Sequence, residues 1–484
     1  MELASRPVRE TKERELKFAA PDEFAVVEGL GEPIESRVFT STYYDTPDRA
    51  LATVGVTLRR RLENGKSLWQ LKLPGQGFRR ELERPGGPAR PPRALRDPLF
   101  GLVRGRELAP AAKLKTRRSG VAVREDGRDL AEVVFDSVEV MDNGRVSGTF
   151  NEIEVELLDG DTDALDRIGK ALRQRGARAS DGRPKAFRAL GFAPAPMPTA
   201  SARAPATLHV AAMLARQHRE ILAHDPGVRL GSDPDDLHRM RVAARRARAV
   251  LRAARPILDR AASEPLRDEL EWLGDLLGPA RDLDVLLEHL RGQVDSFPED
   301  DRFAAEGILQ LLAAEHELAR AQLIEGLESE RYLTLLDRLA DVGREPAGSG
   351  RKRPLASLAL RRFKKLREAV ASLPTEPSDA ELHRIRIQVK RARYTAELAE
   401  ATVGKRAARF IARAKLLQDV IGEHQDAVVA ARRIQEALTS TRGSRVAFAA
   451  GRLVEREEER RRKARAAFPQ AWRKLEKSGR RAWR

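Results

Sequence analysis

Two glutamates and a lysine alternate near the start of the chain, in the stretch Glu13-Arg14-Glu15-Leu16-Lys17. If this stretch is a β-strand, the side chains of Glu13, Glu15 and Lys17 lie on one face, because successive side chains of a strand point to opposite faces. Two carboxylates and an ammonium group on one surface could hold a divalent cation beside a phosphate. The alternative is a solvated charged strand or the start of a helix, so the rest of the chain must decide.

The same alternation of charge occurs on later segments with the character of β-strands. The side chains that share a face are Arg59 with Arg61, Gln70 with Lys72, Arg79 with Glu81, and Glu152 with Glu154 and Glu156. In an ordinary sandwich such faces are solvated, which suits one strand but not five. The alternative is a barrel with a polar lumen, in which glutamates hold a divalent metal and basic side chains hold phosphate oxygens.

Like charges confined in one lumen repel severely without their counter-ions, so this lumen should bind both a hard cation and a polyanion. Ligands that are all oxygen atoms point to Mg²⁺ or Mn²⁺ rather than zinc. The whole chain fits a polyanion partner, because 90 Lys and Arg against 73 Asp and Glu give a net charge of +17. The absence of cysteine excludes disulfides, thiolate metal sites and cysteine nucleophiles.

The 484 residues suggest two to four domains at about 100–200 residues each. We find no basic region followed by an apolar run at the N-terminus, and no apolar stretch near the ~18 residues of a membrane span. We therefore expect a cytoplasmic protein with no membrane partner. With only 5% aromatic residues and no evident stacking platform, specific nucleic-acid binding is not expected either.

The residue pattern of the sequence changes near residue 193, and this change predicts an α+β multidomain protein. Residues 1–192 carry short alternating runs between Gly and Pro residues, which favours antiparallel strands, with helices at 21–30 and 163–175. Residues 193–206 are rich in Pro, Ala and Ser and are predicted to be a linker. Residues 207–484 are helical in pattern, and residues 455–484 are predicted to be an exposed helix with a basic tail.

The helical part contains an internal repeat. His238-x-x-Arg241-x-x-x-Arg245-x-x-Arg248 has the same spacing as His383-x-x-Arg386-x-x-x-Lys390-x-x-Arg393, and Asp275–Asp282 matches Asp419–Asp426 at nearly the same offset. Each basic stripe occupies one helical face. Repeats at about 207–345 and 352–484 predict two four-helix bundles with pseudo-twofold symmetry. Two facing stripes would form a groove for a long anion.

Residues 1–192 resemble the CYTH family, the triphosphate tunnel metalloenzymes, which include class IV adenylate cyclases, thiamine triphosphatases and inorganic triphosphatases. The matching motifs are E-x-E-x-K at Glu13–Lys17, Leu58-Arg-Arg-Arg61, Leu71-Lys72-x-Pro-Gly75, Lys115-Thr-Arg-Arg118, Phe135-Asp136, and Glu152-Ile-Glu-Val-Glu156. Lys185 occupies the position of the last basic residue, although the usual Ser-Lys-Tyr is here Pro184-Lys185-Ala186.

The resemblance implies an eight-stranded antiparallel β tunnel barrel that hydrolyses a triphosphate with a divalent metal. Catalysis would involve Glu13, Glu15 and Lys17. Metal binding is expected from Glu13, Glu15, Asp136, Glu152, Glu154 and Glu156, and the sequence does not settle which two of the last three bind. Phosphate binding is expected from Arg59, Arg61, Lys72, Lys185 and from Arg117 or Arg118, since the inward-facing arginine is not settled.

Most of residues 207–484 resemble the CHAD family, helical domains with a conserved histidine that often follow CYTH. The two His-x-x-Arg helices, Arg281-Asp282-Leu-Asp284 and Arg393-Tyr394 with Glu397 carry the resemblance, although Arg245 replaces the commoner lysine and Gln425-Asp426 replaces a second Arg-Asp. The resemblance implies polyphosphate binding by His238, Arg241, Arg245, Arg248, His383, Arg386, Lys390 and Arg393. Whether the histidines bind phosphate or fix helix contacts stays open.

The favoured hypothesis is an inorganic triphosphatase dependent on Mg²⁺ or Mn²⁺, with short polyphosphate as an open further substrate. The chain resembles bacterial inorganic triphosphatases in which CHAD follows CYTH, and association with polyphosphate granules is a further expectation. The alternatives are a non-catalytic polyphosphate-binding protein and a class IV adenylate cyclase-like enzyme. The sequence leaves open the chain length preferred, the oligomeric state and any cooperation between the domains.

Overall fold

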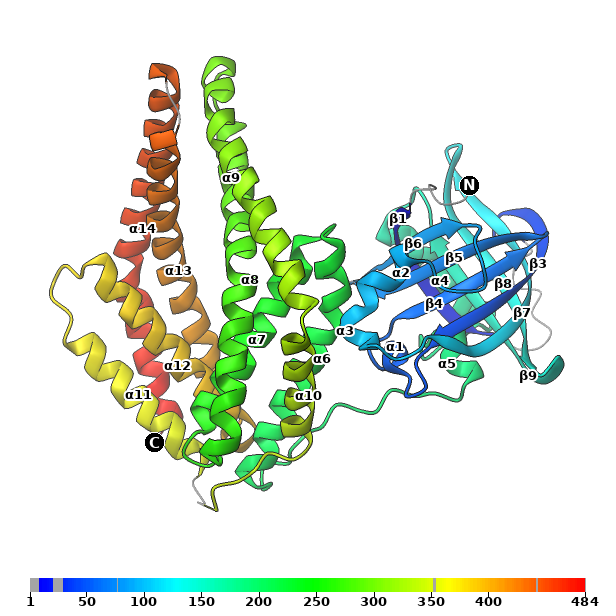
Figure 1. Ribbon diagram of the computed structural model, residues 1–484, viewed down its shortest axis with the longest axis horizontal. Helices are drawn as coiled ribbons and strands as arrows, with labels where there is room; N and C mark the ends of the chain where they lie inside the picture. The colour runs from blue at the N-terminus through cyan, green and yellow to red at the C-terminus, as the bar shows by residue number, and fades with distance from the viewer. Residues whose placement is uncertain (1–7, 21–28, 76, 351–353, 441–442, 484) are drawn as a thin grey trace. The chain divides into compact units, whose positions relative to one another are not determined.

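The structure is a computed structural model, and it describes residues 8–20, 29–75, 77–350, 354–440 and 443–483. The chain forms two compact units, one of Met1–Pro196 with Asp225–Leu230 and the other of Met197–His224 with Gly231–Arg484. The first is built on an antiparallel sheet and the second on helices (Figure 1). The predicted order of a sheet domain followed by a helical domain is therefore confirmed.

The strands of the described residues form one ten-stranded sheet in the order β1-β6-β5-β4-β3-β7-β8-β9-β2-β10. The bounds are β1 (Arg9–Glu13), β2 (Glu15–Ala19), β3 (Glu32–Asp45), β4 (Thr57–Glu63), β5 (Lys66–Pro74), β6 (Arg79–Pro85), β7 (Ala109–Glu125), β8 (Arg128–Asp142), β9 (Arg145–Leu157) and β10 (Arg178–Ala179). Short helices α1 (Ala50–Thr53), α2 (Arg93–Arg96) and α3 (Phe100–Val103) lie in the connections.

The predicted strand at Glu13–Lys17 is interrupted at Arg14. β1 ends at Glu13 and pairs with β6, whereas β2 begins at Glu15 and pairs with β9. Because β6 and β9 lie toward opposite ends of the strand order, this short segment brings the two sides of the sheet together. The order still ends in β1 and β10, so a closed eight-stranded barrel is not confirmed; the break at Arg14 and the two-residue β10 raise the count to ten.

The apolar face of the sheet packs under helix α4 (Thr162–Gln174), which confirms the helix predicted at 163–175. Ile153 and Val155 of β9 are fully buried in one cluster with Leu165 and Leu172 of α4. Since side chains alternate along β9, the glutamates of this strand must point to the other face. Most of the helix predicted at 21–30 lies outside the described residues.

The helical unit holds nine helices within the described ranges, five before residue 351 and four after residue 353. Their bounds are α6 (Ala206–Leu230), α7 (Pro234–Ala254), α8 (Arg260–Val294), α9 (Glu299–Leu327), α10 (Glu330–Arg344), α11 (Leu355–Ala371), α12 (Asp379–Val403), α13 (Lys405–Ser440) and α14 (Ser444–Ala482). The described helices include none with the length and apolar character needed to cross a membrane.

The two basic stripes fall on α7 and α12, which pack against each other. The second repeated motif falls on α8 and α13, which pack against α7 and α12 respectively. The repeated motifs therefore occupy corresponding helices, while α10 has no partner in the second copy. Four-helix bundles related by pseudo-twofold symmetry stay a prediction.

The structure has a helix over residues 455–482, as predicted, but the prediction that it is exposed is wrong. Helix α14 packs against α13 and α9, and it buries Leu453, Glu457 and Leu475. The buried residues form a sparse stripe among many arginines and glutamates, which explains why composition alone suggested exposure.

Candidate functional site

A cavity opens on the polar face of the sheet and encloses about 840 Å³, including its open mouths. Its lining brings together ten of the residues predicted for the first domain, which come from six strands and one short helix: Glu13, Glu15, Lys17, Arg59, Arg61, Lys72, Arg118, Glu154, Glu156 and Lys185. We call it the tunnel cavity. The lining is almost wholly ionic, so the cavity is suited to charged ligands.

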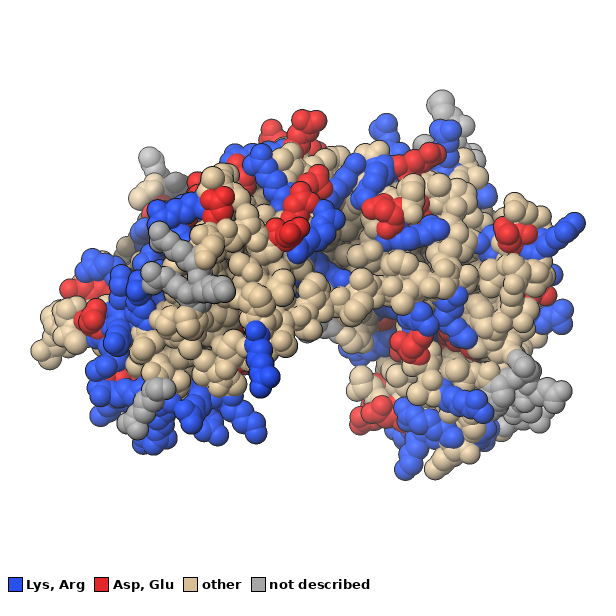
Figure 2. All heavy atoms as spheres, turned by 90° about the horizontal axis from the view of Figure 1, so that it is seen from below, with Lys and Arg blue, Asp and Glu red and all other residues tan. Residues whose placement is uncertain are grey.

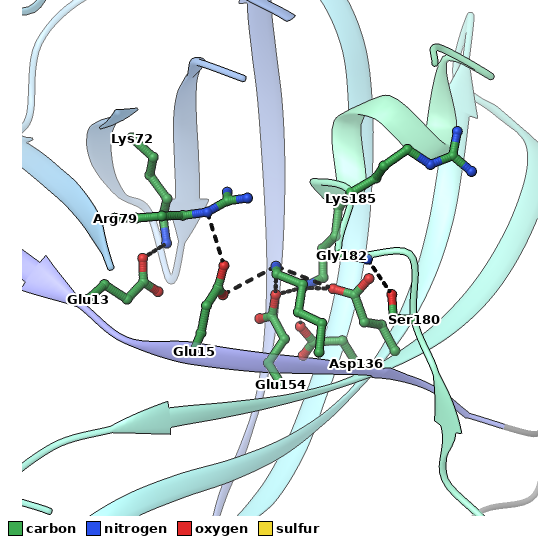
Figure 3. Close-up of polar contacts among 12 residues, drawn as sticks. Glu13, Glu15, Lys72, Arg79, Asp136, Glu154, Ser180, Gly182 and Lys185 are labelled. Carbon is green, nitrogen blue, oxygen red and sulfur yellow. Dashed lines mark hydrogen bonds and ion pairs between the residues drawn. The ribbon is translucent and has the colours of Figure 1, made fainter. Parts of the chain in front are cut away.

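The two glutamates of the opening motif form ion pairs with basic side chains of β5 and β6. Lys72 Nζ lies 2.6 Å from Glu13 Oε2, and Arg79 Nε lies 3.3 Å from Glu15 Oε1. Figure 3 shows Glu13 directed at Lys72 and Glu15 at Arg79. Strand β1 thus presents its carboxylate to β5, and β2 presents its carboxylate to β6.

The register of β2 against β9 sets the next layer of charge. Lys17 is the cross-strand partner of Glu154, and its Nζ lies 2.5 Å from Glu154 Oε1. Burial lowers the pKa of Lys17, but Glu154 and Glu15 raise it more, so its pKa is above the ordinary value. Lys17 therefore stays an ammonium group that donates hydrogen bonds and cannot act as a base near neutral pH.

The cross-strand pair beside it has like charges, because Glu15 faces Glu156. Burial, and then the neighbouring carboxylate of Glu13, raise the pKa of Glu156 to about 7. Like charges directly opposite each other destabilise a sheet. This part of the cavity therefore has more carboxylate than its own cations neutralise.

Lys185 is the first residue of α5 (Lys185–Ala189) and reaches three carboxylates. Its Nζ lies 2.9 Å from Asp136 Oδ2, 3.0 Å from Glu152 Oε1 and 2.7 Å from Glu154 Oε1. Burial lowers the pKa of Lys185, and the three carboxylates raise it well above its ordinary value. The departure from the family pattern at Pro184 and Ala186 thus leaves the ammonium group in the cavity.

Two of the predicted metal ligands, Asp136 and Glu152, do not line the tunnel cavity. Both are 0% exposed and are cross-strand partners on β8 and β9. Both form ion pairs with the ammonium group of Lys185. The alternation along β9 predicted that its glutamates share one face of the sheet, but it could not predict that Glu152 is fully buried while Glu154 and Glu156 line the cavity. Both carboxylates pair with Lys185, and their assignment as metal ligands stays a prediction; Glu154 and Glu156 are the glutamates of β9 that line the cavity.

The open choice between Arg117 and Arg118 is decided by the pleat of β7. Arg118 lines the cavity, and its guanidinium donates to Asp136 Oδ1 at 2.8 Å and to Glu154 Oε2 at 2.8 Å. Arg117 is exposed on the other face of the strand and does not line the cavity, so Arg118 is the arginine of this pair that we assign to phosphate binding.

Three arginines from the two strands that flank β3 form one cationic part of the lining, namely Arg59 and Arg61 of β4 and Arg118 of β7. Tyr43 and Gln70 hold Arg59, whose Nε donates to Gln70 Oε1 at 2.7 Å. Burial lowers the pKa of Arg61, Glu63 opposes that change, and Arg59 and Arg118 lower it further. Mutual repulsion of this kind is relieved when an anion binds among the guanidinium groups.

Several charged or polar residues of the lining were not predicted as site residues from the sequence: Arg37, Tyr43, Gln70, Arg79, Glu81, Glu83 and Glu132. Arg79 and Glu81 continue the charge alternation that was visible in the sequence, so period two could have identified them. Arg37 follows a register shift in β3, and neither Arg37 nor Glu132 belongs to the charged alternation described above.

The described residues include no group of three or more His, Cys, Asp or Glu side chains already arranged around a metal position. The donor chemistry nevertheless fits a hard divalent cation. Glu13, Glu15, Glu154 and Glu156 offer only oxygen atoms, and the buried Oε1 of Glu81 has no hydrogen-bond partner in the described structure. Burial raises the pKa of Glu156, and the neighbouring carboxylates of Glu13 and Glu81 raise it further, so a bound cation would relieve the repulsion within this group.

A second site lies in the helical unit, where five predicted residues line one cavity of about 1310 Å³: His238, Arg241, Arg245, Arg386 and Lys390. We call it the first helical cavity. Asp282 pairs with Arg241 at 2.6 Å and lines the cavity with Asp426. Burial and four surrounding arginines, led by Arg386, lower the pKa of Lys390 to about 7. Figure 2 shows Lys and Arg side chains gathered over this helical unit.

The other three predicted residues of the stripes lie elsewhere. Arg248 forms an ion pair with Glu271 and borders a neighbouring cavity. His383 is exposed and shares a 3.0 Å hydrogen bond with Gln425. Arg393 pairs with Glu397 at 3.3 Å, which fixes α12 internally. Helical spacing puts each stripe on one face, but the crossing of α7 and α12 determines which part of that face meets the cavity.

The chain is similar to known protein families and to proteins of known sequence. Residues 11–181 match the CYTH domain, and residues 212–435 match the CHAD domain. The uncharacterized protein Rv2226 of Mycobacterium tuberculosis is 31% identical over 474 residues, which cover 91% of this chain and 90% of that protein.

Two solved structures are also similar. PptA from Streptomyces chartreusis has 24% identity and a TM-score of 0.48, covering 56% of this chain and 100% of that one. The crystal structure of the CHAD domain from the plant Ricinus communis has 27% identity and a TM-score of 0.45, covering 57% of this chain and 94% of that one.

An antiparallel sheet with an acid-and-base cavity, followed by helices with paired basic stripes, defines the class of this protein. The chain belongs to the proteins in which a CYTH domain is followed by a CHAD domain. CYTH proteins include triphosphatases and cyclases and generally depend on divalent metal.

Proposed function

We propose that the tunnel cavity hydrolyses inorganic triphosphate with the help of a divalent cation. The observation that supports this proposal is that the lining has an arginine-rich part and a glutamate-rich part. Arg59, Arg61 and Arg118 come from β4 and β7, the strands on either side of β3 in the middle of the sheet, whereas Glu13 and Glu15 come from the segment that joins its two sides. A short phosphate chain needs both parts, because its oxygens bind guanidinium groups and its excess charge requires a metal.

The basic residues would bind and orient the phosphate chain. Arg59 is held in position by Tyr43 and Gln70, so little side-chain freedom is lost when it binds phosphate. Lys17, which stays protonated, would donate a hydrogen bond to a phosphoryl oxygen and stabilise the charge that develops during transfer.

Glu13, Glu15, Glu154 and Glu156 are the residues that would hold Mg²⁺ or Mn²⁺. When bound, such a cation neutralises phosphate charge and lowers the pKa of a water molecule. Lys72 and Lys17 now pair with Glu13 and Glu154, so binding of a cation and a polyanion would exchange these internal partners for external ones.

The helical unit is proposed to bind inorganic polyphosphate along α7 and α12. Arg241, Arg245, Arg386 and Lys390 lie around one cavity, where burial and then the surrounding arginines lower the pKa of Lys390. Arg245 donates to the hydroxyl of Tyr394 at 3.2 Å, so a contact between α7 and α12 holds this arginine in position. Phosphates would bind as successive charges, with no base recognition.

A substrate panel tests the enzymatic proposal. Phosphate and pyrophosphate release would be measured from inorganic triphosphate, ATP, thiamine triphosphate and short polyphosphate, each with Mg²⁺ or Mn²⁺. Preferred release of phosphate from inorganic triphosphate supports the proposal. Cyclic AMP with pyrophosphate from ATP would indicate a cyclase instead, and no turnover of any substrate would leave a polyphosphate-binding protein.

A further inference from the structure

A second cavity lies beside the first helical cavity and encloses about 830 Å³, including open space. We call it the second helical cavity. Its cationic lining comes from three helices: Arg248 and Arg252 of α7, Arg362 of α11, and Arg391 of α12, together with Arg245 and Lys390, which also line the first helical cavity. The stripe motif accounts for Arg248, Arg245 and Lys390 but not for the other three arginines.

The charge of this cavity is not balanced by the protein. No carboxylate is found in its lining, whereas Asp282, Glu423 and Asp426 line the first helical cavity. Within the described ranges, Arg252, Arg362 and Arg391 form no ion pair with a carboxylate, although Arg248 pairs with Glu271 outside the lining.

Burial and the neighbouring Arg252 lower the pKa of Arg362, and burial and Arg362 lower that of Arg391. The Nε of Arg391 is buried and has no hydrogen-bond partner among the described residues. Three guanidinium groups that repel each other across three helices are arranged to receive an anion with several charges.

The floor of the cavity is apolar, which separates it from a simple phosphate track. The apolar part of the lining, which we call the floor, consists of Ala249 and Ala253 of α7 and Ile387 of α12, and Tyr394 also lines the cavity. An inorganic phosphate chain has no apolar part to cover these side chains. A ligand that joins several phosphates to an apolar or aromatic body would contact both the floor and the rim, and a cavity of this size fits such a molecule.

We propose that the second helical cavity binds a nucleoside triphosphate or a similar organic polyphosphate. The phosphates contact Arg252, Arg362 and Arg391, and the organic part covers Ala253 and Ile387. Because Arg245 and Lys390 border both helical cavities, this ligand competes with inorganic polyphosphate for two of its cations. The site is separate from the tunnel cavity, and the inference does not depend on hydrolysis.

Isothermal titration calorimetry on the full chain tests the proposal, with ATP as the probe and EDTA present so that no turnover occurs. All variants carry Arg59→Ala to weaken binding in the tunnel cavity. Arg362→Ser and Arg391→Ser each remove a cation from a repulsive cluster, and we expect each to weaken ATP binding about tenfold. The matched comparison is Arg281→Ser, since Arg281 lines the first helical cavity and not the second; it should weaken ATP binding less than either of these two variants does.

Inorganic triphosphate in the same titrations tests the role of the organic part. We expect it to bind the Arg59→Ala chain at least fivefold more weakly than ATP, because it leaves the apolar floor uncovered. Equal or tighter binding of inorganic triphosphate, an equal effect of Arg281→Ser on ATP, or no ATP binding to the Arg59→Ala chain would each overturn the proposal. Absence of hydrolysis by the wild type would refute the proposed function and leave this inference standing.

Discussion

Lys390 should make polyphosphate binding depend on proton uptake. It lies where the two helical cavities meet, and burial with Arg386, Arg245, Arg241 and Arg393 lowers its pKa to about 7. At pH 7 roughly half of the free molecules therefore carry a proton on this amine, and a bound polyanion restores the charged form. Binding should take up about half a proton at pH 7 and nearly one at pH 8.5.

The pKa of Lys390 also gives the expected change in the affinity for polyphosphate between pH 7 and pH 8.5. The protonated fraction falls from about one half at pH 7 to about 3% at pH 8.5, so the affinity should fall about fifteenfold over this interval. His238 stays neutral in the free protein there, because burial and then Arg281 lower its pKa below the ordinary value.

Calorimetry in buffers of different ionisation enthalpy, at constant ionic strength, measures the proton uptake directly. The matched variant is Lys390→Arg, which stays charged across the interval and should take up about half a proton less at pH 7. Equal proton uptake by the wild type and Lys390→Arg would refute the reasoning, because another group would then be responsible.

Three further outcomes are expected from single substitutions. Lys185→Met should lower the free energy of unfolding by about 3–5 kcal/mol in urea titrations, since buried carboxylates lose their partner, while the exposed Lys113→Met should change it little. Arg118→Ala should raise the KM for inorganic triphosphate at least tenfold and Arg117→Ala should not, and equal effects would contradict the assigned faces. Tyr394→Phe should weaken polyphosphate binding about two- to tenfold in calorimetry, because an arginine loses its hydrogen bond, and unchanged affinity would exclude a positioning role.

The sequence was sufficient for the features that depend on local periodicity. Glu13, Glu15 and Lys17 share the cavity because alternation along a strand is set by the pleat, and the basic stripes lie on single faces because helical spacing is equally local. The break at Arg14 could not be predicted, since it arises where one segment leaves β6 and joins β9.

How deeply each side chain is buried, and which residues it contacts, could be learned only from the tertiary structure. Asp136 and Glu154 both follow the expected alternation, yet Asp136 is fully buried behind Lys185 while Glu154 lines the cavity. His383 has the same motif position as His238 but is exposed beside Gln425. The arginines Arg362 and Arg391 belong to no motif, and only the packing of α11 against α12 brings them to one cavity.

The central claim is that the tunnel cavity performs the hydrolysis and the helical unit does not. The most direct measurement is kcat for inorganic triphosphate with Mg²⁺ or Mn²⁺ in two double variants of the full chain. Glu13→Gln with Glu15→Gln should lower kcat by at least a hundredfold, whereas Arg241→Ala with Arg386→Ala should leave kcat within twofold of the wild type. Full activity in the first variant, or loss of activity only in the second, would contradict the account.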